Sequence, residues 1–138
     1  MISVLPASGE EKRAFLAQEP EALELFILRE GETERGRAGV SLRHGSLWII
    51  QFETEEKNAP EDRRFWADTL LRAAASCAAN HGAYRLCCTL PGLESFLRSE
   101  GFSREGNVWS LPTESIVKIK KNAAFSANTA CQESADRL

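Results

Sequence analysis

The sequence predicts a mixed α/β (α+β) fold in which a mostly antiparallel central sheet is flanked by helices. The first half of the chain shows the two-residue periodicity of strands, with short polar turns between the runs. After residue 60 the apolar residues recur at three- and four-residue steps, as in an amphipathic helix, and shorter strand and helix patterns then alternate. At 138 residues the chain suits one domain, predicted over residues 1–121 with a polar tail at 122–138.

The first half is predicted to contain one short helix and four strands. Ser8, with Glu11 three residues later, matches a capping box, so the helix is expected to run from there to about residue 19, before Pro20. A polar turn at 31–36 and a short one at 44–45 make the last three strands an antiparallel meander. The predicted strands cover residues 2–5, 23–29, 37–43 and 46–53.

The second half is predicted to begin with a long helix over residues 60–81. Asn58 and Glu61 are the candidate caps at its start, and Gly82 suits its end. A buried strand (84–89), a short helix (92–100) and another strand (108–111) follow. Residues 116–119 fit either a last strand or a helical turn, and the chain after residue 121 is expected to be peripheral or ordered by a partner.

The composition argues against several classes of partner. With 17 basic and 20 acidic residues the net charge is -3, and no basic stripe interleaves with aromatic residues, so nucleic acid is not expected as a partner. No segment resembles a signal peptide or a membrane span, which favours a soluble cytoplasmic protein without membrane contact. The four cysteines have no metal-ligand spacing, so no metal site is predicted and free, mostly buried thiols are expected.

The order of these elements resembles that of the GNAT superfamily of N-acetyltransferases. The local matches are Leu70 and Leu71 in the alanine-rich helix that runs into residues 81–83, and the segment 96–102, which closes a short helix on Gly-Phe. The likeness covers roughly residues 37–111. It implies a GNAT-like sheet and an acyltransferase that uses acetyl-coenzyme A and an amine acceptor. The chain has room for one helix between its first two strands, where the family usually has two that shape the acceptor pocket.

The resemblance also implies where the cofactor binds. In the family, a loop of the form Arg/Gln-x-x-Gly-x-Gly/Ala at the start of the long helix receives the diphosphate on its backbone N–H groups. Registered on the leucine pair, this sequence places Asp62, Phe65 and Ala67 at those positions, and only Ala67 conforms. Arg63 and Arg64 are candidates to bind the phosphates instead, although solvated arginines near the end of a loop are the simpler interpretation of both. The cofactor-binding residues implied in this way are Phe52, Thr54, Arg63, Arg64, Phe65 and Ala67.

Catalytic residues are implied at the end of the fourth strand, where family members hold the pantetheine arm beside a carboxylate base. Glu53 is the first candidate base and Glu55 the second, although a solvent-facing glutamate is the simpler interpretation of each. The tyrosine that often serves as general acid in the family corresponds to Leu97. Cys87 and Cys88 lack a neighbouring histidine and are poor candidates for nucleophiles.

Two functions follow from these observations. The first is an acyl-coenzyme A-dependent N-acyltransferase acting on an unidentified amine. The second is a catalytically degenerate GNAT-like domain that serves as an interaction or regulatory module, a homodimer through exposed strand or helix surfaces. In this second interpretation, Phe65 and Trp66 fill the former cofactor cleft or meet a partner.

Overall fold

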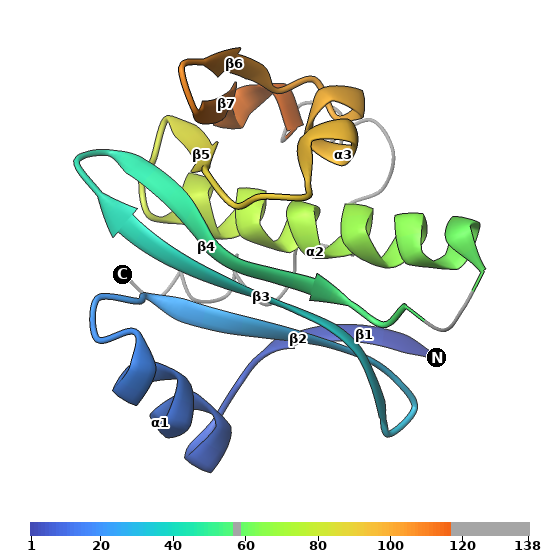
Figure 1. Cartoon of the computed structure of the whole chain (residues 1–138). Coiled ribbons are helices and arrows are strands. Elements are labelled where there is room, and N and C mark those ends of the chain that lie inside the picture. Colours follow the sequence, from blue (N-terminus) through green and yellow to red (C-terminus); the bar gives the residue numbers. More distant parts are fainter. Residues whose placement is uncertain (57–58, 117–138) are drawn as a thin grey trace.

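The structure is a computed structural model that describes residues 1–56 and 59–116. Within these residues, seven strands form one sheet in the order β1-β2-β3-β4-β5-β7-β6 (Figure 1). Neighbouring strands are antiparallel except for β4 and β5, which are parallel. The predicted mixed, mostly antiparallel sheet flanked by helices is therefore confirmed. The elements are β1 (Ile2–Pro6), α1 (Gly9–Gln18), β2 (Glu24–Glu30), β3 (Thr33–Arg43), β4 (Ser46–Thr54), α2 (Pro60–Asn80), β5 (Arg85–Cys88), α3 (Glu94–Ser99), β6 (Ser103–Glu105) and β7 (Val108–Pro112).

The structure differs from the predicted elements in several places. β3 begins at Thr33, inside the predicted turn, because residues 33–36 pair with β2 and so belong to the ladder. β6 was not predicted, since its three residues are all exposed and carry no apolar pattern. Ser8 occupies the N-cap position of α1 without a side-chain hydrogen bond, and the carboxylate of Glu11 pairs with Arg29 instead.

The caps of α2 also differ in part from the prediction. The N-cap is Ala59, which has no capping side chain, and Pro60 provides a first helical residue that needs no N–H partner. The predicted cap Asn58 lies outside the described residues. Gly82 follows the helix with φ +74, so the predicted glycine stop is confirmed.

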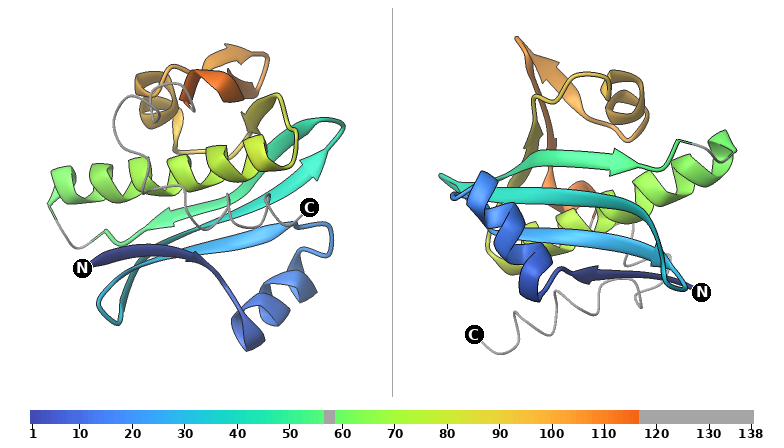
Figure 2. Two further views of the ribbon diagram at one scale, coloured as in Figure 1. Left: turned by 180° about the vertical axis from the view of Figure 1, so that it is seen from behind. Right: turned by 60° about the horizontal axis from the view of Figure 1, so that its bottom comes forward.

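The helices α1 and α2 lie on opposite faces of the sheet (Figure 2). α2 covers the larger core, in which Leu70, Leu71 and Ala74 have no exposed surface. α1 covers a smaller cluster centred on Phe15, whose ring lies against Gly39 of β3. Trp66 belongs to the larger core at 4% exposure, so it supports packing of α2 and is not available to a partner.

A bulge in β4 divides this strand into two parts. Val40 pairs with Ile49 and Gly39 with Gln51, so Ile50 is the extra residue. β5 pairs with β4 only along the first part, from Ser46 to Ile49. The second part of β4, up to Thr54, is therefore paired with β3 alone among the described residues, and its other edge faces the region of α2 and α3.

The described chain ends in a helical turn over residues 113–116, in which Ile116 is buried. Of the two conformations predicted for 116–119, residue 116 takes the helical one, while Val117, Ile119 and the predicted tail at 122–138 lie outside the described residues. None of the helices in the described part has the length and apolar character needed to cross a membrane.

Candidate functional site

A groove lies where β4 diverges from β5, between the first turns of α2 and the short helix α3. Its volume is about 560 Å³, within the range of roughly 300–1,000 Å³ typical of small-molecule sites. β4, α2, α3 and the loop before α3 all contribute to its wall. The lining residues are Phe52, Thr54, Pro60, Arg63, Arg64, Ala67, Gly92, Leu93, Ser95, Phe96 and Ser99.

Five of the six predicted cofactor-binding residues line this groove: Phe52, Thr54, Arg63, Arg64 and Ala67. The sixth, Phe65, does not line it, and its side chain is 53% exposed on α2. This difference follows from helix geometry, because residues 63, 64 and 67 share one face of α2 and residue 65 points away from it. Phe65 therefore does not plug the groove.

The two arginines of the groove differ in their hydrogen-bond partners. The Nε atom of Arg63 is buried and has no hydrogen-bond partner among the described residues. In contrast, Nη2 of Arg64 donates to Oε2 of Glu100 at 3.1 Å, and its guanidinium carbon lies 5.5 Å from the centre of the Phe96 ring. Arg63 as a whole is half-buried, but a buried donor atom without a partner is costly, so Nε of Arg63 is the groove atom that most needs an acceptor.

Two phenylalanines connect the walls of the groove. The rings of Phe52 and Phe96 stack with their centroids 5.7 Å apart, which joins β4 to α3. Apolar rings beside the cationic Arg63 and the hydroxyls of Ser95 and Ser99 give the groove both apolar and polar surface. A ligand with an extended arm and an anionic group matches this combination.

The start of α2 does not form the loop of backbone donors that the resemblance implies. The helix already includes Asp62, Phe65 and Ala67, and the N–H groups of Asp62 and Arg63 both donate to the carbonyl of Ala59, at 3.0 and 3.2 Å. The amides farther along α2 are used by the helix ladder. An anion in the groove would therefore be bound by side chains and not by a row of free amides.

The two candidate bases lie away from the groove. Glu53 follows Phe52 and therefore points to the opposite face of β4, where it accepts a hydrogen bond of 2.6 Å from Nε2 of Gln51. Glu55 accepts from Nη1 of Arg35 through both carboxylate oxygens, at 3.1 and 3.0 Å. Both glutamates line a separate hollow of about 200 Å³ at the open end of the β3–β4 hairpin, away from its turn.

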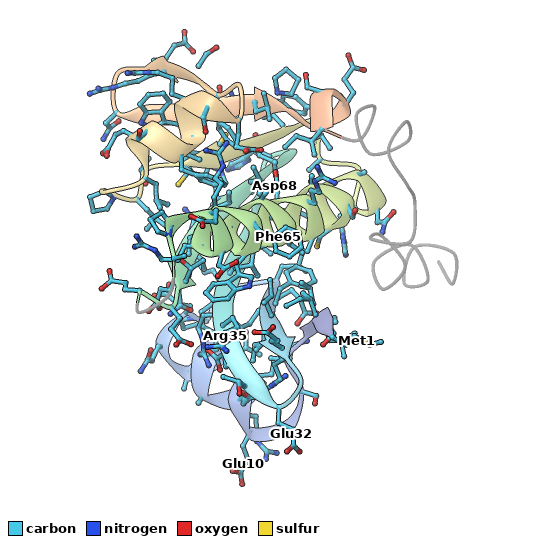
Figure 3. All side chains as sticks on the ribbon, turned by 90° about the vertical axis from the view of Figure 1, so that its right-hand side faces the viewer. Met1, Glu10, Glu32, Arg35, Phe65 and Asp68 are labelled. Atoms are coloured by element: carbon cyan, nitrogen blue, oxygen red, sulfur yellow. The ribbon has the colours of Figure 1, made fainter. Side chains whose placement is uncertain are left out.

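A carboxyl pair that sequence reasoning did not identify lies beside the groove. Glu100, at the end of α3, contacts Asp68 of α2 as well as Arg64, and Asp68 also pairs with Arg72 at 3.0 Å. Burial raises the pKa of Glu100, and the neighbouring Asp68 carboxylate raises it further, against the lowering effect of Arg64. Asp68 lies on the side of α2 toward α3, whereas Arg35 lies on the strand side (Figure 3). No sequence pattern signals a contact between residues 64 and 100.

The remaining candidates for chemistry lie outside the groove. Cys87 and Cys88 are buried in β5, and this burial raises the pKa of each thiol, which keeps both groups protonated and unreactive. Leu97, at the position of the family's tyrosine, is buried in the core. Tyr84 is the one tyrosine of the sequence and so the one phenol that could act as a general acid; it is exposed, with Arg85 over its ring, and does not line the groove.

Comparison with solved structures identifies the fold, although no protein-family model and no curated protein sequence matches the chain. The crystal structure of a KacTA–DNA complex is similar with a TM-score of 0.68 and 15% identity, over 88% of this chain and 99% of that one. A mutant AtaT toxin bound to the C-terminus of the antitoxin AtaR gives 0.65 and 15%, over 90% and 99%. A GNAT family acetyltransferase from Elizabethkingia anophelis with acetyl-CoA bound gives 0.63 and 12%, over 80% and 97%. The chain has the GNAT acetyltransferase fold.

One expectation from the sequence has to be corrected. The net charge and the absence of a basic stripe argued against nucleic acid as a partner, but a similar structure is that of a complex with DNA. The exclusion was wrong because a chain can belong to an assembly that binds DNA without carrying the basic surface itself. Charge composition therefore does not rule out this class of partner.

Proposed function

We propose that this protein is an acyl-coenzyme A-dependent N-acyltransferase acting in the cytoplasm. The observation that carries the proposal is the groove at the divergence of β4 from β5, in which Arg63 lies beside an apolar wall and its Nε has no hydrogen-bond partner among the described residues. The similarity to an acetyltransferase structure with acetyl-CoA bound supports acetyl-coenzyme A as the ligand.

The groove offers separate groups for the two ends of acetyl-coenzyme A, arginine side chains for the phosphates and a strand edge for the pantetheine arm. Arg63 would bind the phosphates as a planar charged donor, and Arg64 lies one residue away on the same rim. The second part of β4, including Phe52 and Thr54, would hold the pantetheine arm along the edge that pairs with no described strand. When bound, the cofactor supplies an activated acyl thioester.

The protein's own contribution would be positioning and proton removal. Glu53 is the better base of the two candidates because its carboxylate receives one hydrogen bond from Gln51, whereas Arg35 engages both oxygens of Glu55. Glu53 lies on the face of β4 that α1 partly covers, opposite the groove. An amine that approaches from this face would meet the acyl group at the open edge of β4, where Glu53 can accept its proton.

Thermal unfolding with and without millimolar acetyl-coenzyme A tests the proposal. A ligand at about 100 times its dissociation constant adds roughly 2.7 kcal/mol to the free energy of unfolding, which gives a clear rise in Tm. The rise should disappear in a double variant, Arg63→Ala with Arg64→Ala. It should persist in Arg13→Ala, a control that removes one exposed arginine from α1. No rise in the unaltered protein would refute the proposal.

The second candidate function is an interaction or regulatory module, and two observations favour it. The helical start of α2 removes the backbone donors at the motif positions, and Phe65 presents an exposed aromatic ring on α2 (Figure 3). The similar AtaT structure is that of a toxin bound to part of its antitoxin. A partner protein, or a second copy in a homodimer, would then contact α2 around Phe65. Such a module would show no Tm change with acetyl-coenzyme A, whereas Phe65→Ala would weaken its assembly.

A further inference from the structure

Glu100 occupies an unfavourable position for a carboxylate, and this cost is offset mainly by Arg64. Its side chain is 15% exposed, and it follows the last turn of α3, where the helix dipole disfavours negative charge. The charged groups that face it from α2 are Arg64, at 3.1 Å, and Asp68, whose own carboxylate pairs with Arg72. Within the described residues, Arg64 is the cation in direct contact with Glu100.

The same contact determines what Arg64 can do in the groove. While its guanidinium donates to Glu100 and lies over the Phe96 ring, it already has a carboxylate acceptor. Arg63, the neighbouring lining residue, has no such acceptor among the described residues. The groove thus contains one arginine ready for an anion and one that must first leave the partly buried carboxylate of Glu100.

We propose that Glu100 competes with the anionic ligand of the groove for Arg64, and so regulates the affinity of the site. This inference rests on the proposed function, since the ligand is the phosphate-bearing part of an acyl-coenzyme A. With Glu100 ionised, the Arg64–Glu100 pair persists and the ligand is bound mainly by Arg63. With Glu100 protonated, a state in which it can donate a hydrogen bond to Asp68, Arg64 turns to the ligand and binding strengthens.

The sign of the pH dependence follows from this exchange. The bound state prefers a proton on Glu100, so binding takes up protons and the affinity rises as the pH falls. Since one carboxyl is involved, the dissociation constant changes by at most about tenfold per pH unit. Because the Arg64–Glu100 pair is half-exposed on the arginine side, we expect a total change of about three- to tenfold between about pH 8 and about pH 5.

Calorimetric titration with 3′-dephospho-coenzyme A tests the inference. This probe carries a diphosphate diester that stays ionised over the whole pH range, so the probe's phosphates do not titrate. The unaltered protein should bind it about three- to tenfold more tightly at about pH 5, with proton uptake seen as a dependence of the heat on the buffer. Glu100→Gln should bind tightly at both pH values and take up no proton at this site. Glu105→Gln, which removes an exposed carboxylate on β6, should behave like the unaltered protein.

The possible failures are distinguishable. Binding that is equal at both pH values and unaffected by Glu100→Gln would overturn the role of Glu100 and leave the proposed function intact. Absence of binding in every variant at both pH values would overturn both. A loss of affinity in Glu100→Gln, with its Tm unchanged, would show that Glu100 supports the ligand site and would also overturn the competition.

Discussion

Replacing Arg63 with alanine should reduce the affinity for acetyl-coenzyme A far more than the same change at Arg64. Nε of Arg63 has no hydrogen-bond partner among the described residues, so binding a phosphate breaks no existing hydrogen bond of this atom. The whole free energy of the new interaction therefore contributes to the affinity. A hydrogen bond to a charged group contributes about 1.5–3 kcal/mol, which corresponds to a loss of roughly 10- to 150-fold in affinity. Arg63→Lys, which keeps the charge without the planar fork, should lie between these values and the unaltered protein.

Arg64 already has partners in the protein, so we expect it to contribute less than Arg63 to the affinity for the ligand. To reach a phosphate it must leave Glu100 and the Phe96 ring. A partly exposed ion pair contributes up to about 1 kcal/mol and a cation–π contact about 0.5–1 kcal/mol. The loss of these two contacts offsets most of the free energy that Arg64 gains by binding a phosphate. At about pH 8 we expect Arg64→Ala to reduce affinity less than about tenfold. Titration calorimetry measures both variants, and an equal or larger loss at Arg64 would refute this assignment of the two arginines.

Further predictions concern the scaffold and its titrating groups. Gly39→Ala places a methyl group against the Phe15 ring and should lower the free energy of unfolding by about 1–3 kcal/mol in urea denaturation; an unchanged midpoint would show that α1 moves aside freely. Because the folded state raises the pKa of Glu100, the stability gained from its protonated form is present below about pH 4.5 and is lost as the pH rises through the folded pKa. Glu100→Gln should therefore match the unaltered protein in Tm at low pH and exceed it at about pH 8. Cys87 and Cys88 should resist alkylation in the native protein and react after unfolding, as mass spectrometry would show.

The sequence was sufficient for the fold because the decisive features are local. The change from two-residue to 3.6-residue periodicity at residue 60 predicts α2 correctly, and the short separation between β3 and β4 predicts their hairpin. β6 was missed because three exposed residues bury no apolar face. The divergence of β4 depends on the extra residue Ile50, which nothing in the local pattern distinguishes from its neighbours.

The site was predictable only in part, since it depends on contacts between distant segments. Five implied cofactor residues share one groove, because the order of elements already places β4 beside the start of α2. Phe65 was placed at a loop position, whereas the helix directs it outward. The contact of Arg64 with Glu100 spans 36 residues and depends on how α3 is oriented, which a single sequence does not specify.

Phe65 offers the clearest separation of the two proposed functions. Its ring is 53% exposed and lies outside the groove lining, so Phe65→Ala should leave acetyl-coenzyme A affinity within about twofold if the groove is a cofactor site. Phe96→Ala, which removes a lining ring and the stack on Phe52, provides the contrast and should weaken binding about tenfold or more. Titration calorimetry measures both affinities, and light scattering measures assembly. If Phe65→Ala disrupts assembly while no variant binds the cofactor, the exposed ring belongs to an interface and the GNAT fold serves recognition here.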